Sequence, residues 1–92
     1  MTLDPASMTA FRAGVEIPLS AKEFALLEVL MRRAGSVVSR QELLERAWDY
    51  GYENRSNVID VYIRYLREKI DRPFGCASIE TVRGVGYRVK RT

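Results

Sequence analysis

The sequence predicts an α+β fold: an N-terminal antiparallel sheet within residues 1–19, a three-helix core over residues 20–71 and a C-terminal β-hairpin over residues 79–90. Three observations predict it. They are alternating apolar residues near the N-terminus, two helix-capping motifs each followed by apolar residues at helical spacing, and two short strands joined by a glycine-rich turn. A chain of 92 residues builds one hydrophobic core but rarely two, so we expect residues 1–92 to form a single domain.

The N-terminal sheet is predicted from residues 8–19, which read MTAFRAGVEIPL. They form two short strands around Ala13-Gly14, and in the second strand apolar residues alternate with Glu16 and Pro18, as in a strand with one buried face. Proline has no backbone N–H to donate to a neighbouring strand, so this strand belongs at a sheet edge. The residues around Leu3 can add a further short strand.

The first two helices are each introduced by a capping box, S-x-x-E. Ser20 and Glu23 form the first box, and Ser39 and Glu42 form the second. In such a motif the serine oxygen and the glutamate carboxylate accept from backbone N–H groups that have no partner within the helix. Gly35 can end the first helix in a left-handed conformation. The apolar stripes that follow contain Phe24, Leu27 and Met31 in the first helix, and Leu43, Leu44, Ala47 and Trp48 in the second.

A third helix is predicted over residues 56–71, and the Pro73 segment should end it. At 100° per residue, one face collects the residues expected in the core, which are Ile59, Ile63, Leu66 and Ile70. The outward face mixes basic, amide and apolar groups: near the opposite pole are Asn57, Val61, Arg64 and Glu68, with Val58 and Tyr65 beside them and Arg67 on a flank. Asp60 lies four residues before Arg64 and seven before Arg67, which favours an ion pair that orients an arginine over a catalytic carboxylate.

Residues 79–83 and 87–90 are predicted to pair as a hairpin across Gly84-Val85-Gly86, where glycine can adopt the positive φ of a tight turn. Three helices followed by such a hairpin indicate a winged helix-turn-helix. In this architecture the third, or recognition, helix can lie in the DNA major groove, while the hairpin, or wing, reaches the minor groove. A fold alone does not fix a function, so the side chains must support this interpretation.

Composition narrows the possible functions. The chain contains no histidine and a single cysteine, Cys76, which excludes an internal disulfide and a thiolate metal cluster. No poised nucleophile and base pair is visible, so we expect no enzymatic activity, no catalytic residue, no metal and no cofactor. No apolar run approaches the roughly 18 residues of a membrane span, and the N-terminal residues do not show a basic segment followed by a hydrophobic one, so a cytoplasmic location is expected.

Positive charge is concentrated in the C-terminal part. The net charge is +3, yet residues 1–54 contain six basic and eight acidic side chains, whereas residues 55–92 contain nine basic and four acidic ones. This half is therefore the candidate surface for a polyanion. Its predicted helix also offers specific contacts: Arg64 and Arg67 can bond phosphates or guanine, Asn57 can pair with adenine, and Val61 can pack on a thymine methyl.

Four segments in this order and spacing resemble one family: LSAKEFALLEVL, SRQELLERAW, NVIDVYIRYLREKI and IETVRGVGYRV. The chain resembles the C-terminal winged-helix effector domain of OmpR/PhoB-family response regulators over essentially its whole length. The resemblance implies a four-stranded N-terminal sheet. It also implies sequence-specific binding of double-stranded DNA for transcriptional control, with two molecules reading tandem direct repeats.

The resemblance also implies DNA-binding residues. Positions matching the recognition helix are Asn57, Val58, Val61, Tyr62, Arg64, Tyr65 and Arg67, those matching the wing are Thr81, Arg83 and Tyr87, and Trp48 matches a residue near phosphate. Some family members carry arginine where this chain has Asn57 and Tyr65, so Tyr65 can stack, bond a phosphate or pack on the wing, and Arg55 can compensate for the charge missing at Asn57. Trp48 can equally be a core residue.

Further partners follow from the same resemblance. The loop Tyr50, Gly51, Tyr52, Glu53 and Asn54 matches a turn that contacts RNA polymerase in activators. The family carries a receiver domain before this module, for which the chain has no room, so we expect dimerisation on DNA and phosphorylation by a sensor kinase to belong to a longer parent protein. The alternative from another class is a winged-helix protein-interaction module, whose binding would respond weakly to salt.

Overall fold

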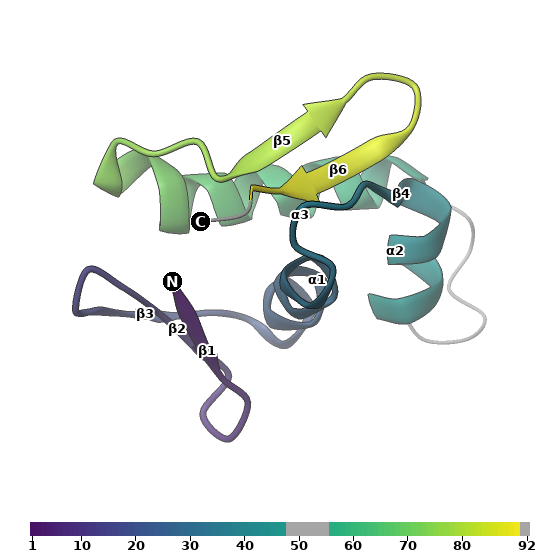
Figure 1. Cartoon of the computed structure of the whole chain (residues 1–92). Helices are drawn as coiled ribbons and strands as arrows, with labels where there is room; N and C mark the ends of the chain where they lie inside the picture. Colours follow the sequence, from purple (N-terminus) through teal and green to yellow (C-terminus); the bar gives the residue numbers. More distant parts are fainter. Residues whose placement is uncertain (48–55, 91–92) are drawn as a thin grey trace.

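The computed structural model describes residues 1–47 and 56–90, which form three α-helices and two small antiparallel sheets (Figure 1). The fold class is therefore α+β, as predicted. Helix α1 contacts helices α2 and α3 and also strand β6 of the C-terminal hairpin. None of the described helices is long and apolar enough to cross a membrane.

The N-terminal sheet contains β1 (Thr2–Asp4), β2 (Thr9–Arg12) and β3 (Val15–Pro18), in the order β1-β2-β3. Strand β3 lies at an edge, as its proline predicts. Ala10 pairs with Ile17, and both are buried against the helices. Among the described residues the sheet has three strands, so the expectation of a four-stranded sheet, which the family resemblance implied, is wrong. The next strand, β4 (Val38–Ser39), pairs instead with the C-terminal hairpin.

Helix α1 spans Ala21–Arg32, and its predicted capping box is complete. Ser20 Oγ accepts from Glu23 N at 3.2 Å, and Glu23 Oε1 accepts from Ser20 N at 2.8 Å. Helix α2 spans Arg40–Ala47, and Ser39 Oγ accepts from Glu42 N at 3.1 Å. The carboxylate of Glu42 turns away to accept from Arg33 and Arg46, so only half of the second predicted box is formed.

The third helix is less regular than its periodicity predicts. Helix α3 is α-helical over Ser56–Leu66, continues as a wider π-helical turn over Arg67–Asp71 and ends in a 3₁₀ turn over Arg72–Phe74. Gly75 closes this segment with φ of 64°. The four predicted core residues, Ile59, Ile63, Leu66 and Ile70, are all fully buried. They pack with apolar residues of α1, α2 and both sheets into one cluster.

The second sheet has the order β4-β6-β5, with β5 at Ile79–Val82 and β6 at Gly86–Val89. The hairpin turn covers residues 83–85, one residue earlier than predicted, because Gly86 already belongs to β6, and Gly84 has φ of +75°. Gly86 is required for a different reason. A Cβ built on it would lie 2.1 Å from the backbone oxygen of Val38, so the close approach of β4 to β6 leaves no room for a side chain.

Candidate nucleic-acid interface

The outward face of α3 presents one cation beside apolar groups. Arg64 is exposed, Tyr65 is 44% exposed, and Val61 is half-buried. Val58 and Tyr62 lie lower on the helix, partly buried against the core cluster. The rings of Tyr62 and Tyr65 meet edge to face, with centroids 5.5 Å apart. This contact orients the ring of Tyr65, because aromatic pairs prefer such edge-to-face geometry.

Two exposed arginines occupy separate elements of this region. Arg64 lies on α3, and Arg83 lies in the hairpin turn, two residues before Val85, which is 51% exposed. Within residues 1–47 and 56–90 no side chain forms an ion pair with either guanidinium. A guanidinium is well suited to phosphate and to guanine edges.

Tyr87, by contrast, is held inside the protein. It is only 4% exposed, and its hydroxyl donates to Asp60 Oδ1. The guanidinium carbons of Arg40 and Arg67 lie over its ring, 5.6 and 5.7 Å from the centroid. Such geometry is typical of cation–π contacts. Burial and the hydrogen bond to Asp60 both raise the pKa of Tyr87, so the phenol stays protonated and remains a donor.

Arg67 is likewise engaged within the protein. Its Nη2 donates to the backbone oxygen of Ile79 at 2.9 Å and to Thr81 Oγ1 at 2.8 Å, both on β5. The predicted wing residue Thr81 is exposed, but its oxygen already accepts from Arg67. Three of the residues assigned to DNA by resemblance, Arg67, Thr81 and Tyr87, thus connect the hairpin to α3 and to the π-helical turn that follows it.

Asp60 forms an ion pair, but its partner is Arg40 and neither of the predicted arginines, Arg64 and Arg67. Its Oδ1 accepts from Arg40 Nε at 2.9 Å, and from neither Arg64 nor Arg67 among the described contacts. Burial acts to raise the pKa of Asp60, but the hydrogen bonds from Tyr87 and Arg40 outweigh it, and the pKa lies below its usual value. The role of Arg40 could not be predicted from the sequence, because no local pattern relates positions 20 residues apart.

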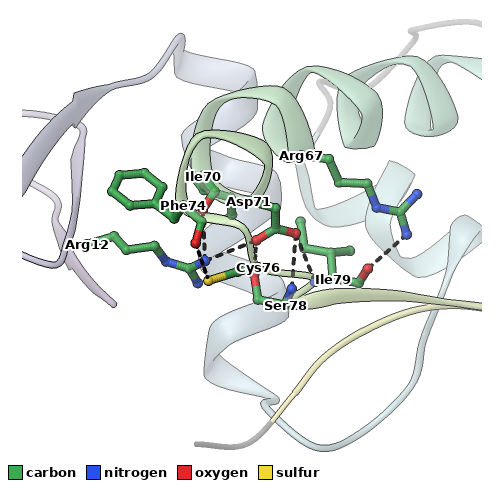
Figure 2. A network of polar contacts seen from close by, with 8 residues as sticks. All are labelled: Arg12, Arg67, Ile70, Asp71, Phe74, Cys76, Ser78 and Ile79. Carbon is green, nitrogen blue, oxygen red and sulfur yellow. Dashed lines mark hydrogen bonds and ion pairs between the residues drawn. The ribbon is translucent and has the colours of Figure 1, made fainter.

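A second polar network joins the far end of the helix to both sheets (Figure 2). Asp71 is 4% exposed, and its carboxylate accepts from Arg12 of β2 at 3.1 Å, from Ser78 N at 3.1 Å and from the Ser78 hydroxyl. Arg12 also donates to the backbone oxygen of Ile70 at 2.8 Å. This network fixes the root of the hairpin against the helix end and the N-terminal sheet.

Several predicted site residues fall outside the described part of the chain. These are Trp48, Arg55, the side chain of Asn57, and the loop of Tyr50, Gly51, Tyr52, Glu53 and Asn54. Elsewhere, across residues 1–47 and 56–90, no group of three or more histidine, cysteine, aspartate or glutamate side chains could hold a metal ion. The described part of the site is therefore a surface of two arginines, one exposed tyrosine and a hairpin tip.

Three helices with a hairpin braced against the third define the chain as a winged helix. A family model described as "Transcriptional regulatory protein, C terminal" matches residues 14–89. The chain belongs to this family, the DNA-binding output domain of OmpR/PhoB-type response regulators, which is not an enzyme. It is 60% identical over 91 residues to the transcriptional regulatory protein TcrA of Mycobacterium tuberculosis, covering 99% of this chain and 36% of TcrA.

Solved structures agree with this assignment. The DNA-binding domain of Bacillus subtilis CssR superposes with a TM-score of 0.82 at 30% identity, covering 96% of this chain and 97% of CssR. The DNA-binding domain of the response regulator AdeR, solved in complex with an intercistronic region, gives a TM-score of 0.86 at 20% identity. That comparison covers 99% of this chain and 93% of AdeR, and at this identity it supports the fold alone.

Proposed function

We propose that this domain binds double-stranded DNA sequence-specifically, with α3 in the major groove and the tip of the hairpin in the adjacent minor groove. The observation that supports this best is the pair of exposed arginines on the two elements, Arg64 and Arg83, neither of which has an ion-pair partner among the described residues. Val61 and Tyr65 lie on the same helix as Arg64 and supply apolar contacts to base edges.

The partly exposed residues Val58 and Tyr62 extend this surface along α3. Trp48, Arg55 and Asn57 join it as proposed phosphate or base contacts on the grounds of the family resemblance. For the same reason we propose that the loop of residues 50–54 contacts RNA polymerase. Altered transcription with unaltered DNA affinity in variants of this loop would support that contact, and loss of both would contradict it.

The chain spans about a third of the length of the curated relatives it matches. Regulation at the level of a whole protein is therefore part of the proposal. We propose that a longer, cytoplasmic parent binds tandem direct repeats as a dimer and is phosphorylated by a sensor kinase through a domain outside these residues, thereby controlling transcription.

The test is selection of the purified 92-residue domain on a random duplex library at two salt concentrations, with sequencing of the bound DNA. We expect an enriched direct repeat with half-sites about one helical turn apart. Binding should weaken steeply with salt, because each phosphate contact releases counterions. Absence of binding at both concentrations would contradict the proposal and favour a protein-interaction module.

Arg64 provides a sharper form of this test on the selected duplex. If it bonds a base, Arg64→Ala should cost about 1–3 kcal/mol and relax the preference at one position. If it binds phosphate alone, the salt dependence should fall by about one unit. Arg32→Ala is the matched control, because Arg32 is an equally charged, exposed residue on α1. Unchanged affinity and salt dependence would remove Arg64 from the interface.

A further inference from the structure

Tyr87 links the hairpin to two helices at once. It belongs to β6, the central strand of its sheet, while Arg40 opens α2, and Asp60 and Arg67 lie on the third helix and on the π-helical turn that follows it. The hydroxyl is fixed by Asp60, and the ring is in contact with both guanidinium groups. Tyr87 therefore cannot move without breaking contacts to α2 and to the third helix together.

Arg67 adds a second link, to the other strand of the hairpin. Its two bonds to β5, at 2.9 Å to Ile79 and 2.8 Å to Thr81, are formed by the same nitrogen that a bidentate phosphate or guanine contact would use. If the guanidinium left these acceptors for DNA, the partly buried backbone oxygen of Ile79 would lose its hydrogen bond from Arg67, and leaving such an oxygen unsatisfied costs free energy. The geometry thus favours the contacts within the protein.

We propose that Arg67, Thr81 and Tyr87 are positioning residues that hold the hairpin at a fixed angle to α3, so that the two DNA-reading elements act as one rigid unit. They do this without touching DNA, and Arg40 and Asp60 hold Tyr87 in place. This inference rests on the proposed function. Its consequence is that the contributions of the helix and of the hairpin to DNA affinity depend on each other. The brace itself exists in the free protein and can be tested there.

The first measurement uses the free domain. Residual dipolar couplings of backbone amides in β5 and β6, compared with those of α3, report the angle between hairpin and helix. Thr81→Val removes the hydroxyl that accepts from Arg67 while keeping side-chain volume, and it should change this angle or broaden its distribution. Thr81→Ser keeps the hydroxyl and should preserve the angle. Thr2→Val is the matched control, since Thr2 is an exposed strand threonine of the other sheet.

The second measurement is affinity for the duplex recovered by selection. We expect Thr81→Val to weaken binding roughly five- to tenfold with an unchanged salt dependence, and Thr81→Ser to stay within about twofold. Arg67→Met should weaken binding similarly, also without changing the salt dependence. The double variant should bind about as well as Arg67→Met alone, because both substitutions break the same link. Thermal unfolding of each variant confirms that it is folded.

Two results would overturn the proposal. A salt dependence lowered by about one unit in Arg67→Met, with Thr81→Val binding like the wild type, would make Arg67 a phosphate contact. Unchanged dipolar couplings in both variants would show that no brace exists. If the wild-type domain selects no duplex, the proposed function fails. The residual dipolar couplings of the free domain then still show whether the hairpin is held at a fixed angle to α3.

Discussion

The carboxylate of Asp71 connects three segments that are distant in the sequence: β2 through Arg12, the end of the third helix on which Asp71 itself lies, and the start of β5 through Ser78. The ion pair is well shielded from water, with the side chains of Arg12 and Asp71 14% and 5% exposed. Within such a network, loss of one charge leaves the other buried without compensation, which costs far more than loss of a surface pair.

We therefore expect Asp71→Asn to lower the free energy of unfolding by roughly 3 kcal/mol. The substitution keeps the side-chain volume but removes the charge opposite Arg12. Urea denaturation followed by circular dichroism measures the change. Glu80→Gln is the matched control, because the Arg88–Glu80 pair is more than one third exposed on both sides and should contribute less than about 1 kcal/mol. Equal effects of the two substitutions would contradict this role for Asp71.

Glu23 introduces a pH dependence. Its carboxylate accepts from Lys69 at 2.6 Å and from the backbone of Ser20. Burial acts to raise its pKa, but these bonds outweigh it, and the pKa lies below the ordinary value of 4.5. The folded state thus binds a proton less readily than the unfolded chain. The resulting stabilisation is present above the ordinary pKa and is lost as the pH falls through the lowered value.

Glu23→Gln should remove this contribution while keeping a residue that can still cap the helix. We expect the variant to be less stable than the wild type at neutral pH, and the difference to shrink at an acidic pH below the lowered pKa of Glu23, where the wild-type carboxylate is protonated. Urea titrations at the two pH values measure the difference. Glu16→Gln, on the exposed face of β3, is the control and should leave the pH dependence unchanged. A constant difference between Glu23→Gln and the wild type at both pH values would contradict the prediction.

At the scale of elements, the hairpin depends on two glycines for different reasons. Gly84 adopts a positive φ with open space around it, whereas Gly86 has no room for a Cβ beside Val38. We expect Gly84→Ala to cost about 1 kcal/mol of strain. Gly86→Ala should cost on the order of 3 kcal/mol, because β4 and β6 must separate.

Urea denaturation separates the two glycine variants, and amide hydrogen exchange locates the damage. Protection should be lost in β4 and β6 of Gly86→Ala, where the two strands pair, and retained in Gly84→Ala. A loss of protection confined to the turn in both variants would contradict the close-approach explanation.

Local sequence patterns predicted well those features of helices, strands and turns that depend on residues close together in the sequence. The capping box of Ser20, the edge position of Pro18, the buried face of the third helix and the glycine turn were all confirmed. The π-helical turn was not foreseen, because an ideal helical wheel assumes a constant turn. In the structure the wider turn buries both Ile70 and Asp71, which are neighbours in the sequence.

At the scale of the whole molecule, prediction from sequence reached its limit at contacts between distant segments. The pairs Arg12–Asp71, Arg40–Asp60 and Asp60–Tyr87 join residues 20 to 59 positions apart, and no periodicity links them. The pairing of β4 with β6 was missed for the same reason. The contact with Asp60 holds Tyr87, a side chain that the family resemblance assigns to DNA, so the role of Tyr87 depends on tertiary packing.

Strand β6 is the middle strand of its sheet, although among the described strands it is the last to be synthesised. Neither β4 nor β5 has its sheet partner until β6 is available, and the pairing of Val38 with Tyr87 closes a long loop. Such non-local pairing forms late in folding. On the ribosome, the helices can collapse as they emerge, but the hairpin and its anchors assemble only after residues 86–89 leave the exit tunnel. Until then the nascent chain exposes β4, and later β5, without their sheet partner, and such unpaired strands are open to chaperones and to aggregation.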